Sequence, residues 1–435
     1  MSTRLLLVAM IFLKCGISLV AASTLPIPDT PAGHALGAWL DAFNSGDRAR
    51  VESFEGAHAP WLTLDAEMGL RARTGGYDLL SIDQSNKLWI VFRTKERASS
   101  AEIYGRLVVR SYDPDHITLL SLAPAGVTSP EFTLDEAERT RVIDGAAKLL
   151  EKFYLFPDVA KRVSEKLRKL QERGEYRGIT DPEIFSIRFG DDLVMLSGDK
   201  HIGVDYFPKA MPPEQPPPRP HPAPRQLAAV NCGFEKAEHY PPNIGYLKLT
   251  MIAEPENCIQ TASAAMTFLA DSDALIIDLR ETRGGSPRMV AVICSYLFDE
   301  SVHLDDIDDH QENMTEQLWT IPYLPGKKFT GKPVWVLISG RTFSASEELA
   351  YDLKSLKRAT LIGESTGGGA HTMAPHRIDE HFFIRVPFGR FVNPITKTDW
   401  EGTGVEPDIK VSAANALDEA LRRAREQTAA AQSAR

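Results

Sequence analysis

The 435-residue sequence is poor in cysteine, with four residues, and in aromatic side chains, at 8%. The cysteine spacing fits no zinc-ligand pattern. A P-loop, a dinucleotide-binding glycine pattern, a run of basic residues and internal repeats are also missing. With a formal net charge of −10, these absences argue against nucleic acid or an anionic membrane surface as the main partner. Nothing in the pattern predicts a cofactor or a bound metal.

The remaining composition is that of an ordinary globular protein, with 43% hydrophobic and 25% charged residues. A chain of this length is expected to form two or three domains. Residues 1–23 have an early arginine, an apolar stretch and small residues at the end, which predicts a signal peptide. No later segment is apolar for long enough to span a bilayer. We therefore expect an exported protein, periplasmic or secreted.

Three cysteines would remain after removal of the signal peptide, namely Cys232, Cys258 and Cys294. An odd number cannot pair completely within one chain. A Cys232–Cys258 disulfide would suit an oxidising compartment, and buried free thiols are the alternative. The sequence leaves this choice open, and none of the three is placed as a catalytic cysteine.

The first half of the mature chain is predicted to form two structural units, an α+β domain and a helical bundle. Residues 24–128 read as a small α+β domain, with a helix from residue 31 and strands near 88–95, 102–111 and 116–124. This order resembles the cone-shaped fold of nuclear transport factor, and we expect a scaffolding role. Residues 129–207 read as a helical bundle that begins with a Thr133–Glu136 capping box and ends in a strand near His201. Residues 208–226 are rich in proline, which predicts an extended linker.

The second half of the sequence is predicted to form an α/β core over residues 227–415, followed by a C-terminal helix or tail over residues 416–435. Apolar strands near 244–250, 274–280, 333–339 and 359–364 alternate with helical segments, which favours a mostly parallel sheet with helices on its faces. Ligands in such sheets bind beyond the carboxyl ends of the strands. The loops RETRGGS and SGRTFS follow two of these strands and end at Ser286 and Ser344.

Ser344 begins the stretch SASEELAYDLK, and two interpretations are open for it. With Glu347 it forms the pattern of a capping box, which would only start a helix. A helix N-terminus also favours developing negative charge, so Ser344 is equally placed to be a nucleophile. The Ala345 amide and the Gly284–Gly285 loop are the candidate oxyanion donors.

A nucleophilic serine needs a base and a group that orients the base. Lys354 and Lys357 lie too far along the same helix to reach its start. His201, at a predicted helix-to-strand junction, is the preferred base, and His371 in GGGAHTM competes with it. Glu401, between Trp400 and two glycines, is the candidate acid.

Three motifs carry a more specific resemblance: DLRETRGGSPRMVAVICSYLF, TFSASEELAYDLKSLKRATLIGESTGGGAH and NPITKTDWEGTGVEPDI. Together with SGDKHIGVDY, they resemble the tail-specific or C-terminal processing serine peptidases. The branch they resemble most is that of interphotoreceptor retinoid-binding protein and the tricorn core. The resemblance covers about residues 130–415.

The resemblance implies roles for individual residues. Ser344 falls on the nucleophile, and the position of the catalytic lysine found in many members is taken by glycine, which we assign to Gly369. The tricorn-like pattern then implies His201 as base and Glu401 as the orienting acid. Lys200 stands where that pattern has a serine, and no PDZ module is recognisable.

The resulting hypothesis is an exported serine peptidase that acts on peptides or unfolded proteins by a Ser-His-Glu mechanism, without a cofactor. The alternative is a non-catalytic carrier of apolar ligands such as retinoids or fatty acids, which the vertebrate relatives bind. The oligomeric state stays open.

Overall fold

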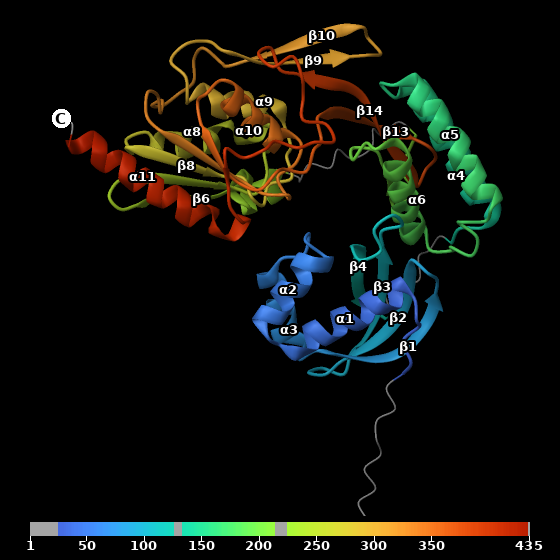
Figure 1. Ribbon diagram of the computed structural model, residues 1–435. Helices are drawn as coiled ribbons and strands as arrows, with labels where there is room; N and C mark the ends of the chain where they lie inside the picture. Colours follow the sequence, from blue (N-terminus) through green and yellow to red (C-terminus); the bar gives the residue numbers. More distant parts are fainter. Residues whose placement is uncertain (1–24, 126–132, 214–223, 434–435) are drawn as a thin grey trace, which may run out of the picture.

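The computed structural model describes residues 25–125, 133–213 and 224–433 (Figure 1). The predicted signal peptide therefore lies outside the described residues, as does most of the predicted linker. Among the described residues, no helix combines the length and apolar character that crossing a membrane requires.

The N-terminal unit has three helices packed on one four-stranded antiparallel sheet (Figure 1). Its elements are α1 (Pro31–Ser45), α2 (Arg48–His58), α3 (Leu64–Thr74), β1 (Tyr77–Ser85), β2 (Trp89–Glu96), β3 (Glu102–Val109) and β4 (Ile117–Pro124). Trp39 and Phe43 of α1 are buried beside Phe92 of the sheet. The sequence predicted α1 and three of the strands, and it missed α2, α3 and β1.

A helical unit follows, made of α4 (Glu136–Phe153), α5 (Pro157–Glu172) and α6 (Pro182–Ser197). The predicted Thr133–Glu136 capping box is wrong, because α4 is capped by Asp135 and Glu138. The amide of the buried Leu134 donates to the carbonyl of Thr180, which keeps the chain extended up to that point. The other face of the N-terminal sheet packs against these helices in a shared core.

The core domain contains a six-stranded sheet with the order β15-β12-β11-β8-β7-β6. Its strands are β6 (Phe234–Tyr240), β7 (Ile244–Leu249), β8 (Ala274–Asp278), β11 (Val334–Ile338), β12 (Thr360–Gly363) and β15 (Ile409–Lys410). All neighbouring pairs are parallel except β6 with β7, which confirms the predicted α/β core. Every residue of β8 and β11 is buried.

Helices cover both faces of this sheet, which explains the continuous apolar strands. One face packs on α8 (Pro255–Leu269), α9 (Pro287–Ser295) and α10 (Ala345–Ser355). The other face packs on α11 (Ala416–Ser433). The short helix α7 (Pro224–Ala229) takes up the last residues of the predicted linker, and its Leu227 enters the core.

A second, antiparallel sheet lies beside the core and was not predicted (Figure 1). It has the order β10-β9-β14-β13, and β5 pairs with β14. Its strands are β5 (Gly203–Tyr206), β9 (His303–Asp309), β10 (Met314–Trp319), β13 (His371–Arg377) and β14 (Phe382–Val392). The pairing of β5 with β14 brings the segment that follows His201 to the core domain.

The capping of α4 gives a stability prediction. Replacing Asp135 by alanine removes the acceptor for the Glu138 amide and should lower the free energy of unfolding by about 1 kcal/mol. Urea denaturation followed by circular dichroism measures the loss. Thr133→Ala is the matched control and should change little, and a larger loss for Thr133→Ala would contradict this helix boundary.

Candidate active site

Ser344 lies beyond the carboxyl end of β11, immediately before the first residue of α10. Its backbone has φ 56° and ψ −130°, in the left-handed half of conformational space that a residue with a Cβ rarely adopts. Such a conformation costs about 1–3 kcal/mol and persists only when neighbouring groups impose it.

The Glu347 side chain imposes this conformation. Its Oε2 accepts hydrogen bonds from the amides of Ser344 at 2.8 Å and Gly369 at 2.9 Å. Its Oε1 accepts from the Gly368 amide at 2.7 Å and from the Thr366 hydroxyl. The carboxyl group is fully buried, and burial raises its pKa against the effect of these donors. Glu347 therefore ties the start of α10 to the loop that follows β12.

The Ser344 hydroxyl oxygen lies 3.1 Å from Nε2 of His201. His201 comes directly before β5, so a partner 143 residues away in the sequence reaches the nucleophile position. The imidazole is buried and stacks on Phe343, with ring centroids 4.8 Å apart. Burial lowers the pKa of His201 to about 4. At neutral pH the ring is uncharged, which is the form that can accept a proton from serine.

Gly369 occupies the position assigned to the lysine of other family members, and the structure leaves no room there for a side chain. A Cβ atom on Gly369 would lie 2.6 Å from Cε1 of His201 and 2.3 Å from the Phe343 ring. A lysine at this position and the observed imidazole therefore exclude each other.

Glu401 does not hydrogen-bond to His201. Its Oε2 accepts from the Ala370 amide at 2.5 Å and lies 3.6 Å from Nδ1 of His371. Its Oε1 is buried and has no hydrogen-bond partner among the described residues, and the same holds for Nδ1 of His201. Burial raises the pKa of Glu401 to about 7.

Asp199 is the residue of this site that the sequence analysis missed. Its Oδ1 accepts from the His201 amide at 2.9 Å, and its Oδ2 accepts from Nδ1 of His371 at 2.7 Å and from the Tyr154 hydroxyl at 3.0 Å. These contacts hold the main chain of His201 in place. The signal was present as an aspartate two residues before the histidine in SGDKHIG.

His371, the competing base, is engaged in this network. Burial opposes its charged form, yet its hydrogen bond to Asp199 and the charge of that carboxylate raise its pKa above the usual value. Although burial has the opposite effect, the contact with His371 keeps the pKa of Asp199 below its usual range. Asp199, His371 and Glu401 are close enough to hold a metal, but hydrogen bonds already account for the Asp199–His371 contact.

The predicted oxyanion donors gather at Ser344. Gly284 has φ 95°, and a Cβ on it would lie 2.8 Å from Cβ of Ser344 and 2.9 Å from the Ala345 nitrogen. Gly285 lies beside Ile252, whose amide donates to the Gly284 carbonyl at 3.0 Å. In the described part of the chain, the amides of Gly285 and Ala345 have no protein acceptor, so both can donate to an oxyanion.

A cleft of about 1170 Å³ opens above Ser344 and His201. Its charged lining residues include Lys200, Arg283, Arg385, Glu254 and Glu281. Lys200, which replaces the serine of the tricorn-like pattern, donates to the Gly367 carbonyl at 2.5 Å. Lys200 contributes a positive charge at the mouth of the cleft. Unlike the serine that it replaces, it has no hydroxyl that could contact His201.

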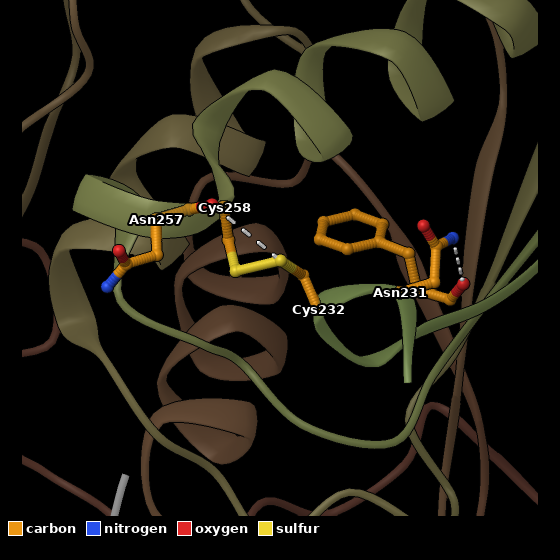
Figure 2. Close-up of a disulfide and its surroundings, with 5 residues drawn as sticks. Asn231, Cys232, Asn257 and Cys258 are labelled. Carbon is orange, nitrogen blue, oxygen red and sulfur yellow. Dashed lines mark hydrogen bonds between the residues drawn. A yellow bond between two sulfur atoms is a disulfide. The ribbon is translucent and has the colours of Figure 1, made fainter. Parts of the chain in front are cut away.

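A disulfide joins Cys232 to Cys258 (Figure 2). Cys232 lies in a short 3₁₀ turn, Asn231–Gly233, and Cys258 lies in the first turn of α8. The disulfide thus attaches the chain after α7 to the segment with Asn257, which lines the cleft. Cys294 is free and buried.

Two family models match this chain, one over the segment that contains His201 and one over the segment that contains Ser344. The model of peptidase family S41 matches residues 243–411, and its N-terminal domain in eukaryotic IRBP matches residues 136–231. Residues 243–411 are thus a peptidase S41 domain, preceded by the N-terminal domain of the same family. Ser344 falls in the first match and His201 in the second.

Similar curated proteins agree with the S41 match. A chloroplastic carboxyl-terminal-processing peptidase 2 of Arabidopsis thaliana is 29% identical over 38% of this chain and 32% of its own length. A carboxyl-terminal-processing protease of Synechocystis sp. is 28% identical over 38% of this chain and 37% of its own length. This chain thus spans about a third of the length of each of these relatives.

Among solved structures, a photosystem II D1 C-terminal processing protease overlaps with a TM-score of 0.39 and 16% identity, over 66% of this chain and 94% of its own.

The Glu347 contacts give the second prediction. Glu347→Gln replaces one acceptor oxygen by a donor, so at least one of the buried amides of Ser344, Gly368 and Gly369 loses its partner. We expect kcat for peptide hydrolysis to fall about 100-fold or more, since small displacements of a nucleophile are costly. Steady-state kinetics measure this fall.

Glu300→Gln, a change of the same kind at an exposed position, should leave kcat unaltered. Wild-type kcat in Glu347→Gln would show that the Ser344 conformation does not depend on this carboxylate.

Proposed function

We propose that this chain is a serine peptidase that hydrolyses peptide bonds, with Ser344 as the nucleophile and His201 as the general base. The observation that carries this proposal is the 3.1 Å contact between the Ser344 hydroxyl and Nε2 of an uncharged, buried His201. A hydroxyl is a weak nucleophile unless a base within hydrogen-bond distance removes its proton.

The first step of the proposed mechanism is attack of Ser344 on the carbonyl carbon of the scissile bond. Nε2 of His201 takes the hydroxyl proton, and the carbonyl oxygen becomes an oxyanion. The amides of Gly285 and Ala345 are proposed to donate to that oxyanion, helped by the N-terminal end of the α10 dipole. His201 then protonates the departing amine, and a water molecule activated by the same imidazole releases the acyl group.

Glu401 is proposed to fix the tautomer of His201. For Nε2 to accept a proton, Nδ1 must carry one, and a buried N–H without an acceptor is unfavourable. Nδ1 of His201 and Oε1 of Glu401 are both buried and unpartnered among the described residues. A direct hydrogen bond after a small shift, or one bridging water, would satisfy both atoms. Asp199 complements this role by holding the His201 main chain.

The substrates are proposed to be peptides or unfolded segments of proteins. The relatives are named for processing carboxyl termini, and an open cleft of about 1170 Å³ has room for a peptide segment. The carrier hypothesis has less support, since it gives no role to the contact between Ser344 and His201.

We also propose that the protein is exported and acts in the periplasm or outside the cell. The Cys232–Cys258 disulfide supports this location, because such bonds persist in oxidising compartments. The predicted divisions near residues 128, 207, 226 and 415 stay proposals for the domain boundaries. They agree with the change from the N-terminal sheet to the helices and then to the core.

A fluorophosphonate probe tests the nucleophile. The wild-type protein should be labelled on Ser344, and Ser344→Ala should lose both labelling and peptide hydrolysis, with at least about a 10⁴-fold fall in kcat. Mass spectrometry and a fluorogenic peptide library measure the two effects. Ser346→Ala, two residues along the same helix, is the control that should keep labelling. Labelling that survives Ser344→Ala would rule out this nucleophile.

The pH dependence tests Glu401. If its carboxylate must be ionised, kcat/KM should rise with pH through about 7, since burial raises its pKa to that value and the protonated form is inactive. In Glu401→Gln this inflection should disappear, leaving a lower rate and only the step near pH 4 at which His201 loses its proton. An inflection near 7 that persists in Glu401→Gln would assign it to another group.

A further inference from the structure

Three carboxyl groups meet inside the core domain, beneath the helix that begins after Ser344. Glu348 and Asp352 lie one turn apart on α10, and Asp305 lies on β9. Each residue is fully buried, and oxygens of the three groups lie within 4.8 Å of one another. Three neighbouring carboxylates in the interior are strongly unfavourable unless positive charge or protons compensate them.

Glu348 provides a second observation. Both of its oxygens are buried and lack a hydrogen-bond partner among the described residues, as do both oxygens of Asp305 and Oδ2 of Asp352. The remaining oxygen, Oδ1 of Asp352, accepts from the Asn393 carboxamide at 3.2 Å. Buried carboxylate oxygens nearly always have partners. Five of these six oxygens therefore have no hydrogen-bond donor among the described residues.

We propose that Asp305, Glu348 and Asp352 bind one divalent cation through their carboxylate oxygens. Oxygens about 2.0–2.6 Å from a common ion lie at most ~5 Å apart, which agrees with the spacing of this cluster. An all-carboxylate set suits hard cations such as Ca²⁺, Mg²⁺ or Mn²⁺.

The cation would connect the helix that follows the proposed nucleophile to the antiparallel sheet that the segment after His201 joins. Glu348 and Asp352 belong to α10, whose N-terminus carries Ser344. Asp305 belongs to β9, which pairs with β14, and β14 pairs with β5, the strand after His201. A metal bridge between α10 and β9 would fix these two parts of the core domain relative to each other.

Bound protons are the competing explanation. Burial and the neighbouring Asp352 raise the pKa of Asp305 to about 11, and burial also raises the pKa of Glu348 and Asp352. A cluster without a cation would then be neutral and satisfied by protons. The two explanations differ in metal content and in the response to chelators.

The experiment uses the full chain purified without chelators. Inductively coupled plasma mass spectrometry should find about one equivalent of a divalent cation. Dialysis against EDTA should remove it and lower Tm by several degrees, and one of CaCl₂, MgCl₂ or MnCl₂ should restore Tm. A protein with no bound divalent cation, whose Tm responds neither to EDTA nor to any of these salts, would overturn the proposal.

Isosteric variants assign the site. Glu348→Gln and Asp305→Asn should lose the bound cation and the cation-dependent rise in Tm, whereas the exposed Glu312→Gln should keep both. If the cluster holds protons instead, Glu348→Gln should leave Tm equal to or above that of the wild type with no change in metal content, which would also overturn the proposal. If the variants fail to fold, the wild-type metal content and EDTA response decide.

Discussion

The buried carboxylate of Glu347 is the interaction on which the site depends. It accepts main-chain hydrogen bonds from Ser344, Gly368 and Gly369, and so joins the start of α10 to the loop after β12. Without these bonds, the amides of Ser344, Gly368 and Gly369 would lose the acceptor that they share. The helix-cap and nucleophile interpretations of Ser344 are therefore compatible, because the same glutamate that caps the helix exposes the hydroxyl to the imidazole.

The site also depends on chain topology. The parallel sheet aligns the carboxyl ends of β8 and β11, and thus places Gly284 beside Ser344. The antiparallel sheet then brings in His201 through the pairing of β5 with β14. Asp199 secures that approach by binding the His201 amide, His371 and Tyr154. Three segments distant in sequence thereby converge on one hydroxyl.

Much of the fold could be predicted from the sequence. The strands near 274–280 and 333–339 are continuous apolar runs, which are typical of parallel strands buried on both faces of a sheet. Strands β9, β10 and β13 escaped prediction because their polar residues resemble those of loops. Strand β14 is mostly apolar and buried, and it was also missed. The start of α4 was misplaced by two residues, since a tertiary bond from Leu134 overrode the local capping pattern. The contacts of Glu401 with Ala370 and His371 likewise depend on loop packing, which no local pattern encodes.

A crystal structure of the protein after reaction with diisopropyl fluorophosphate tests directly whether Ser344 is the nucleophile. We expect a phosphorus atom bonded to Oγ of Ser344. Its phosphoryl oxygen should lie within hydrogen-bond distance of the amides of Gly285 and Ala345, with Nε2 of His201 beside Oγ. An adduct on another residue, or a phosphoryl oxygen turned away from both amides, would contradict this expectation.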